Sequence, residues 1–186
     1  MQTGVAFLRG INVSGQKLIK MEALRDLCEG IGLKEVRTYI QSGNVVFRAK
    51  SLNGLELKLS KAILARYGFD VSVIVKSHES LTKIVSVNPF ITMPGRDPAK
   101  CYVTIFSSVL DFSRLTENIP ESGKDEFKVV GGSVYLYFPE RYGDTKYSNA
   151  FFEKRLASAA TTRNWKTMIT LLGMCDEYND KPSRKS

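Results

Sequence analysis

The first half of the chain alternates apolar and polar residues in four short segments, a pattern typical of half-buried β-strands. These segments are residues 4–9, 35–40, 44–49 and 70–75. Between them, residues 20–31 and a stretch from about Asn53 to just before Gly68 place apolar residues at helical spacing. We expect Asn53 to cap the second helix together with Glu56, three residues on.

The predicted order in this half is therefore β-α-β-β-α-β. This is the order of the ferredoxin-like split βαβ arrangement, in which helices cover one face of an antiparallel sheet. A short helix at 79–87 trails the first half, and the second half shows a similar, shorter series: strands at 102–106, 127–130 and 134–138, and helices at 111–118, 148–156 and from about 164. Gly131-Gly132 is the strongest hairpin signal. The predicted fold class is α+β, with two tandem ferredoxin-like (α-β plait) subdomains, the second ending in a helix rather than a strand.

Proline and glycine suggest where the two halves meet. Half of the six prolines lie between residues 88 and 100, around Gly95, so regular structure is expected to stop there. The predicted domains are a first ferredoxin-like subdomain with a trailing helix at 1–88, a proline-rich connector at 89–100, a second ferredoxin-like subdomain with a C-terminal helix at 101–177, and a polar tail at 178–186.

Composition places the chain among ordinary globular proteins and locates its charge. Of the 186 residues, 43% are hydrophobic and 25% are charged, and 27 basic residues against 19 acidic ones give a net charge of +8. Residues 1–90 hold 13 basic and 7 acidic residues, so six of the eight excess charges lie there. The excess favours an anionic partner for the first subdomain.

The three cysteines are far apart, odd in number and form no C-x-x-C pair, which argues against a disulfide framework or a zinc site. No stretch approaches the roughly 18 apolar residues of a membrane span, and no charged segment precedes an apolar run at the N-terminus. We expect reduced, mostly buried thiols, no metal, no cofactor, no membrane partner and a cytoplasmic protein.

The loop at residues 10–20 is the first candidate site. It follows Arg9 and carries Asn12, Ser14, Lys17 and Lys20, and no acidic residue occurs before Glu22. Its glycines have the spacing of a phosphate-binding P-loop, but glutamine stands where that motif needs lysine, and the predicted sheet is antiparallel. Backbone N–H groups exposed by glycine beside lysines still suit an anion. The alternative is a structural loop with solvated charges.

The second candidate site follows from strand parity. Alternate residues of the second and third strands should project from the face of the sheet that no helix covers, and we expect this face to be exposed. These residues are Arg37, Tyr39, Gln41, Asn44 and Arg48. Because the first and third strands are neighbours in the ferredoxin-like fold, Arg9 is expected near Arg48 or Asn44. Arginines that converge without carboxylates favour phosphate or carboxylate ligands. The alternative is that this face packs on the second subdomain.

Other motifs carry weaker signals. The third strand lacks the alternating aromatics with which RNA-recognition domains stack bases, and Tyr135 and Tyr137 are typical of packing. His78, the only histidine, suits an exposed or capping position, and no Ser-His-Asp set is evident. Serine, asparagine and threonine at 148–149 and 161–162 are natural helix N-caps. Local structure leaves three binding candidates unexplained: Lys146, Arg163 and Asn164.

Four segments together resemble the bacterial domain-of-unknown-function 1697 family. They are FLRGINV at 7–13, RTYIQSGNV at 37–45, YGDTK at 142–146 followed by Ser148-Asn149, and TTRNW at 161–165. The resemblance implies two ferredoxin-like subdomains and implies no function. In one departure, Ser14 stands where the family commonly has a second glycine.

The sequence thus predicts a protein that binds an anionic ligand or partner, phosphate- or carboxylate-bearing, nucleic acid included, at a basic site of the first subdomain. Two alternatives stay open: an enzyme acting on a small anionic metabolite in the cleft between the subdomains, and a protein-interaction module without ligand. The oligomeric state is left open. The candidate binding residues are Arg9, Asn12, Lys17, Arg37, Tyr39, Gln41, Asn44, Lys146, Arg163 and Asn164.

Overall fold

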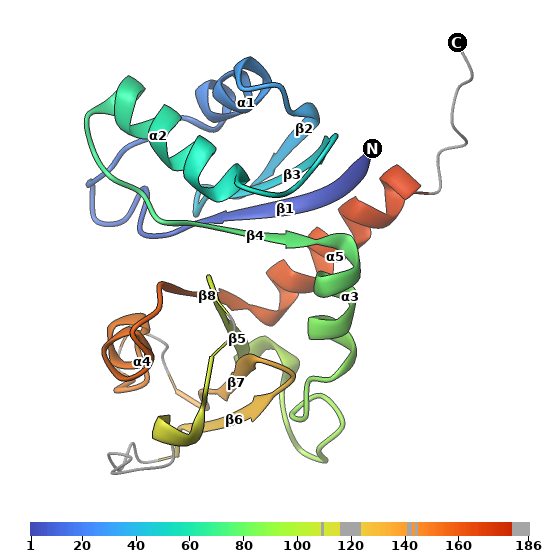
Figure 1. The fold of residues 1–186 in the computed structure, drawn as a ribbon. Coiled ribbons are helices and arrows are strands. Elements are labelled where there is room, and N and C mark those ends of the chain that lie inside the picture. The colour runs from blue at the N-terminus through green and yellow to red at the C-terminus, as the bar shows by residue number, and fades with distance from the viewer. Residues whose placement is uncertain (109, 116–123, 141–142, 144, 180–186) are drawn as a thin grey trace. The chain divides into compact units, whose positions relative to one another are not determined.

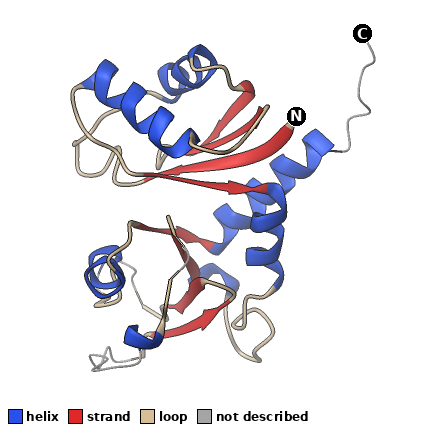
Figure 2. Ribbon diagram, viewed as in Figure 1, coloured by secondary structure: helices blue, strands red, loops and turns tan. Residues whose placement is uncertain are grey.

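The structure of the chain is a computed structural model that describes residues 1–108, 110–115, 124–140, 143 and 145–179. The tail at 180–186, part of the predicted helix at 111–118, and Tyr142 and Asp144 of the family motif lie outside the described residues. The chain divides into two compact units, Met1–Thr82 with Thr170–Ser186, and Lys83–Ile169. We call them unit 1 and unit 2. Figures 1 and 2 show the helices and strands of both units.

Unit 1 contains the six elements that the hydrophobic pattern predicts. They are β1 (Gln2–Leu8), α1 (Met21–Gly30), β2 (Lys34–Tyr39), β3 (Asn44–Ala49), α2 (Leu55–Tyr67) and β4 (Val73–Ser77). The four strands form one antiparallel sheet in the order β2-β3-β1-β4. Helices α1 and α2 cover one face of this sheet (Figure 1).

The core of unit 1 lies between these helices and the sheet. The apolar residues recur at helical spacing in the helices and at every second position in the strands, so each element turns one apolar face toward this core. The buried residues include Leu24, Leu27 and Cys28 of α1, Leu55, Leu59 and Ile63 of α2, and Ala6, Leu8, Val45 and Phe47 of the sheet. Gly68, with φ of 77°, ends α2 as predicted. The predicted cap at the other end is wrong: Gly54 is the N-cap, and no side chain caps the helix there.

The opposite face of this sheet is buried, so the prediction of an exposed face is wrong. Val5, Phe7, Asn44 and Val46 have no exposed surface. Residues 170–179 of helix α5 (Trp165–Asn179) belong to unit 1 and contact the β2 side of this face through side chains that are described below. Tyr178, placed by the sequence prediction in a polar tail, is instead helical and 3% exposed.

Unit 2 repeats the strand order of unit 1. Its elements are β5 (Cys101–Phe106), a 3₁₀ turn (Ser113–Leu115), β6 (Glu126–Val130), β7 (Ser133–Tyr137), α4 (Asn149–Leu156) and β8 (Ala160–Asn164), and its antiparallel sheet has the order β6-β7-β5-β8. The predicted last helix is present as α5, but the prediction that no strand comes between it and the preceding helix is wrong. Strand β8 has the sequence ATTRN, in which Thr161 and Arg163 occupy buried positions, so it shows no apolar alternation. Helix α5 follows it directly.

The proline-rich segment packs within unit 2 instead of separating two units. Phe90 is fully buried and its ring lies 5.9 Å from that of Tyr137. The Arg96 guanidinium lies 4.3 Å from the centroid of the same tyrosine ring and pairs with Glu126 at 2.6 Å. The boundary between the units therefore falls inside α3 (His78–Ser86), and the second crossing falls inside α5. This division differs from the expected boundary at 89–100.

Two smaller predictions about unit 2 are confirmed. Gly131 and Gly132 have φ of 57° and 80° and join β6 to β7 in a two-residue turn. Tyr135 and Tyr137 are buried, and the Tyr135 hydroxyl donates to the Ile84 carbonyl at 2.7 Å, so both serve packing.

None of the described helices is both long and apolar enough to cross a membrane.

The cysteines generate a prediction about reactivity. All three are free and buried, and burial raises the pKa of Cys28 and Cys175 to about 12 and that of Cys101 to about 11. The thiolate is the nucleophile, so iodoacetamide at pH 8 should alkylate the native protein far more slowly than the protein in urea. Mass spectrometry of timed samples measures both rates. Equal rates in the two conditions would show that the thiols are accessible in the native fold.

Candidate functional site

The loop between β1 and α1 forms a small hairpin rather than a phosphate-binding turn. The Asn12 N–H donates to the Lys17 carbonyl at 3.2 Å, and Val13 and Gln16 form an antiparallel bridge. The two residues at the tip, Ser14 and Gly15, have φ of 49° and 75°. A two-residue hairpin turn with both φ values positive has type I′ character.

The side chain of Asn12 holds this loop against a second turn. Its Nδ2 donates to the Ile19 carbonyl at 3.0 Å and to the Gln41 carbonyl at 2.8 Å, and its Oδ1 accepts from the Ile19 N–H at 2.8 Å. Both amide hydrogens are therefore used within the protein. Asn12 was predicted as a ligand-binding residue, but its carboxamide joins the end of the loop to the turn between β2 and β3.

A pocket of about 590 Å³ lies beside this junction. Four parts of unit 1 line it: the β1–α1 loop, the first turn of α1, the β2–β3 turn and the C-terminal end of α2. The lining residues are Asn12, Leu18, Ile19, Lys20, Met21, Ala23, Gln41, Arg66 and Tyr67. The lining contains two basic side chains and no carboxylate, so its charge is positive.

The start of α1 adds to the positive potential of the pocket. Lys20 is the N-cap residue, and its side chain does not cap the helix. The first N–H groups of a helix lack partners within it, and they carry the positive end of the helix dipole. Because Lys20, Met21 and Ala23 line the pocket, this helix end faces it.

Of the residues predicted on the first loop, Asn12 lies at this pocket and the two basic ones have other positions. Lys17 Nζ donates to the Asp70 carbonyl at 2.6 Å, which ties the loop to the segment that leads into β4. The Arg9 N–H donates to the Ser72 carbonyl at 2.9 Å, just past the end of β1. Gln41 also lines the pocket, and its side chain is exposed.

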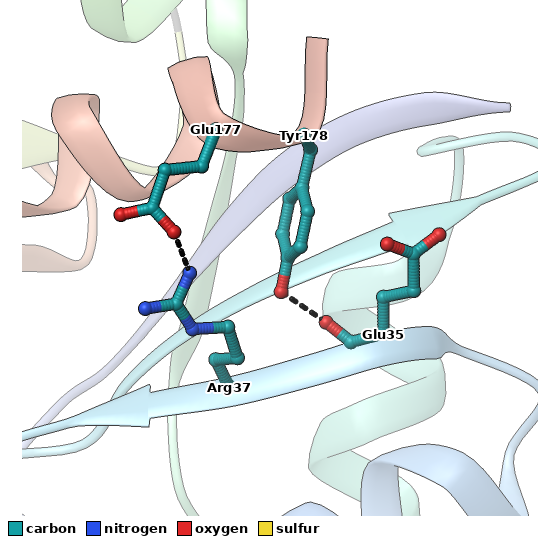
Figure 3. Close-up of polar contacts among 4 residues, drawn as sticks. All are labelled: Glu35, Arg37, Glu177 and Tyr178. Atoms are coloured by element: carbon teal, nitrogen blue, oxygen red, sulfur yellow. Dashed lines mark hydrogen bonds and ion pairs between the residues drawn. The ribbon is translucent and has the colours of Figure 1, made fainter. Parts of the chain in front are cut away.

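Arg37 projects from the other face of the sheet and has a carboxylate partner there. Its Nη1 lies 2.5 Å from Glu177 Oε2, and its guanidinium lies 6.0 Å from the centroid of the Tyr178 ring (Figure 3). The hydrogen bond that Arg37 donates to the Glu177 carboxylate keeps the pKa of Arg37 above its ordinary value. The Tyr178 hydroxyl donates to the main-chain carbonyl of Glu35. These contacts dock the end of α5 on β2.

The main-chain acceptor for Tyr178 arises from an irregularity in β2. The register with β3 shifts between Lys34 and Arg37, and Glu35 has φ of 50°, which together describe a β-bulge on this edge strand. The Glu35 carboxylate pairs with Arg48 at 3.3 Å. Arg37 and Arg48 of the predicted site therefore both have acidic partners, so the premise that the arginines of this face lie apart from carboxylates is wrong.

The strand register also separates the arginines that were expected to converge. Arg48 lies opposite Thr3, near the start of β1, whereas Arg9 follows its end. Six residues of extended chain span roughly 20 Å. Asn44, by contrast, lies opposite Phe7 and is close to Arg9 along the strand, as predicted.

Asn44 and Tyr39 organise the β2–β3 turn. Asn44 is fully buried, and its Nδ2 donates to the Tyr39 carbonyl and to Ser42 Oγ, both at 3.0 Å. Between them Gly43 has φ of 80°, and a Cβ there would lie 2.8 Å from Leu8 Cβ. Asn44 therefore fixes the turn that presents Gln41 and is not itself available to a ligand.

The three candidate residues of the second half, Lys146, Arg163 and Asn164, belong to unit 2, and none of them lines the pocket. Arg163 is buried in β8 and its Nη1 donates to Thr161 Oγ1 at 2.6 Å and to the Thr162 carbonyl at 3.0 Å. Asn164 Oδ1 accepts from the Lys166 N–H at 2.9 Å, so this residue caps the start of α5, and Lys146 is exposed. Ser148 caps α4 as predicted, at 3.3 Å. The prediction of caps at Thr161 or Thr162 is wrong because both lie in β8.

His78 does not sit alone at a helix start. It is partly buried, and its Nε2 lies 2.6 Å from Asp176 Oδ1 on α5, a partner 98 residues away. Among the described residues, no group of three or more histidine, cysteine, aspartate or glutamate side chains could hold a metal ion.

The sequence reasoning missed Arg66 and Tyr67 and did not select Lys20, which it had noted on the loop. Arg66 and Tyr67 directly precede Gly68, the residue that ends α2. Basic residues in the last turn of a helix are readily explained by the helix dipole alone. Only the packing of the end of α2 beside the start of α1 shows that Arg66 and Tyr67 line the same pocket as Lys20.

The Asn12 side chain should contribute more to stability than its partly buried position suggests. Asn12→Gly keeps the left-handed backbone and removes three hydrogen bonds, so we expect the free energy of unfolding to fall by about 2 kcal/mol. Ser14→Gly, in the same hairpin, is the matched control and should be neutral or slightly stabilising. Urea denaturation followed by circular dichroism measures both. Equal losses in the two variants would contradict the role of the carboxamide.

The ion pair on α5 should contribute little by comparison. The side chains of Arg37 and Glu177 are 44% and 57% exposed, so a double-mutant cycle with alanine should give a coupling free energy below about 1 kcal/mol. Tyr178→Phe removes a hydrogen bond from a buried residue and should cost about 1 kcal/mol by itself. The same denaturation assay applies. A coupling well above 2 kcal/mol would make the ion pair, not the tyrosine, the main anchor of α5.

Comparisons with other proteins give a family and a fold. The solved structure of the conserved bacterial protein SP0830 from Streptococcus pneumoniae resembles this one with a TM-score of 0.74, covering 95% of this chain and 99% of that chain at 24% sequence identity. No curated protein matches the chain. A family model described as protein of unknown function (DUF1697) matches residues 1–135, well over half of the sequence. The chain therefore belongs to the DUF1697 family.

Proposed function

We propose that unit 1 binds a small anionic ligand in the pocket between the β1–α1 loop and the end of α2. The observation that carries this proposal is the lining itself, which contains Lys20 and Arg66 and no acidic residue. Among the described residues, neither cation forms an ion pair, so both charges are available to a ligand. Pockets of about 300 to 1,000 Å³ are typical of small-molecule sites, and this one is within that range.

Two further features support an anion. The start of α1, which no side chain caps, contributes Lys20, Met21 and Ala23 to the lining, and the positive end of a helix dipole favours negative charge, although Glu22 in the same turn offsets part of it. The Tyr67 hydroxyl is buried and lacks a hydrogen-bond partner among the described residues, a need that water or a ligand would satisfy. Gln41 adds an exposed carboxamide that can donate to a carboxylate or phosphate oxygen.

The proposal keeps the predicted ligand class and moves the site. Lys20 and Arg66 take the roles first given to Lys17 and Arg37, which donate to Asp70 and Glu177 respectively. Asn12 and Asn44 act indirectly, because they hold the loop and the turn that present Lys20 and Gln41. The basic excess of residues 1–90 is then partly explained by this pocket.

We also propose that each unit is a ferredoxin-like domain. In unit 1, the element order β-α-β-β-α-β and the sheet order β2-β3-β1-β4 support this. In unit 2, the equivalent sheet order β6-β7-β5-β8 supports it. A shared topology of this kind supports a fold assignment and carries no function of its own.

A thermal-shift screen of small anions tests the proposed function. Phosphate, sulfate, short carboxylates and nucleoside monophosphates are added to the wild type and to the variant Lys20→Ala/Arg66→Ala. A ligand that binds only the folded protein raises the melting temperature, and the double variant should lose this shift. Lys61→Ala, which removes an exposed charge of α2 outside the pocket lining, should keep it.

Two results would contradict the proposed function: no shift with any anion, or an equal shift in the double variant. An oligonucleotide arm separates nucleic acid from small ligands. If an oligonucleotide binds through Lys20, log affinity should fall by roughly 0.7 to 0.9 units per contacted phosphate for each unit of log salt. That outcome would assign the pocket to nucleic acid instead.

A further inference from the structure

The pocket lining divides into an apolar part and a charged part. Its apolar members are Leu18, Ile19, Met21, Ala23 and the ring of Tyr67. The polar members are Asn12, whose amide hydrogens are already used, and Lys20, Gln41 and Arg66. A fully hydrated inorganic anion would use the charged groups and leave the apolar wall in contact with water.

Leu18 is the clearest sign that this wall has a ligand. Its surface is 64% exposed although it lines the pocket, and its neighbours along the chain do not cover it. Val13 on the same loop and Ile40, next to Gln41, are also large, apolar and exposed. Single exposed apolar residues are common, and these two lie outside the pocket lining, so Leu18 is the exposed apolar residue that belongs to the pocket.

The apolar wall favours an aliphatic group over a ring. Tyr67 already stacks on Phe69, with centroids 5.8 Å apart, and the Arg66 guanidinium lies 5.7 Å from the Tyr67 centroid. The remaining apolar wall consists of branched aliphatic side chains, an alanine and a flexible thioether, which adapt to a chain.

Leu18 is also held in place before any ligand arrives. The residue before it donates from Nζ to the Asp70 carbonyl, and the residue after it forms two hydrogen bonds with Asn12. Contacts that are fixed in advance do not have to be ordered on binding, so more of the interaction free energy appears as affinity.

We propose that the ligand is a free aliphatic acid. Its anionic head lies between Lys20 and Arg66, and its chain lies along Leu18, Ile19 and Met21. This inference rests on the proposed function and adds the apolar half of the ligand. A carboxylate and a phosphate share the head-group chemistry, so the experiment includes both.

Isothermal titration calorimetry with the full chain and straight-chain carboxylates from butanoate to octanoate, below their micelle concentrations, is the test. Each methylene removed from water is expected to raise the affinity about fourfold, or roughly two-hundredfold across the series. Octanamide, which has the chain without the charge, should bind at least tenfold more weakly than octanoate. Butyl phosphate against butanoate shows which head is preferred, and either preference is compatible with the proposal.

Variants separate the two halves of the site. Leu18→Gln should flatten the dependence on chain length and leave the affinity for butanoate unchanged. Leu57→Gln is the matched control, because Leu57 is exposed to a similar extent, 61%, on α2 and lies outside the lining. Lys20→Ala should weaken the whole series by a similar factor.

The possible failures can be told apart. If phosphate and butanoate bind through Lys20 but affinity changes less than tenfold from butanoate to octanoate, the aliphatic ligand is wrong and the proposed function stands. If octanamide binds as well as octanoate, the charged head is wrong. If no anion binds at all, both proposals fail.

Discussion

The carboxamide of Asn12 is the constraint on which the candidate site depends. It joins three pieces of backbone that are adjacent only in the fold: its own loop, Ile19 at the approach to α1, and Gln41 in the β2–β3 turn. Leu18 and Lys20 flank Ile19, so this junction also sets the position of both halves of the pocket. A second set of bonds, from Asn44 to Tyr39 and Ser42, gives the turn its shape. Asn12 and Asn44, which were predicted to bind a ligand, thus hold the loop and the turn that position other residues of the pocket.

Most of unit 1 could be predicted because its strands and helices bury apolar residues at their own periods, as Val45 and Phe47 or Leu55 and Leu59 do. Strand β8 could not, since threonine and arginine fill two of its three buried positions and leave no apolar alternation to recognise. The cap of α2 failed for another reason: Gly54, with φ of 73°, supplies the turn that a capping side chain was expected to make.

For the site, the sequence could identify the loop and the turn but not the cations that complete the pocket. Arg37 was expected to lack a carboxylate partner, yet Glu177, 140 residues away, pairs with it, and Glu35, two residues before it, pairs with Arg48 instead. Arg66 appeared to be an ordinary helix-end residue, and its place beside Lys20 follows from how α1 and α2 pack on the sheet. The sequence shows how many charged residues lie in each segment, whereas whether a given charge is paired depends on contacts between distant segments.

Ser14 at the hairpin tip has a consequence for how freely this loop moves. With φ of 49°, it occupies a backbone region that a glycine would enter without penalty and that a residue with a β-carbon enters at a cost of about 1 kcal/mol. The same β-carbon removes many of the conformations open to glycine, so an opened loop has fewer alternatives and less conformational entropy to gain. Compared with a glycine at this position, Ser14 gives the hairpin a more limited range of open states. Opening of this loop therefore depends on the breaking of specific hydrogen bonds more than on diffuse flexibility.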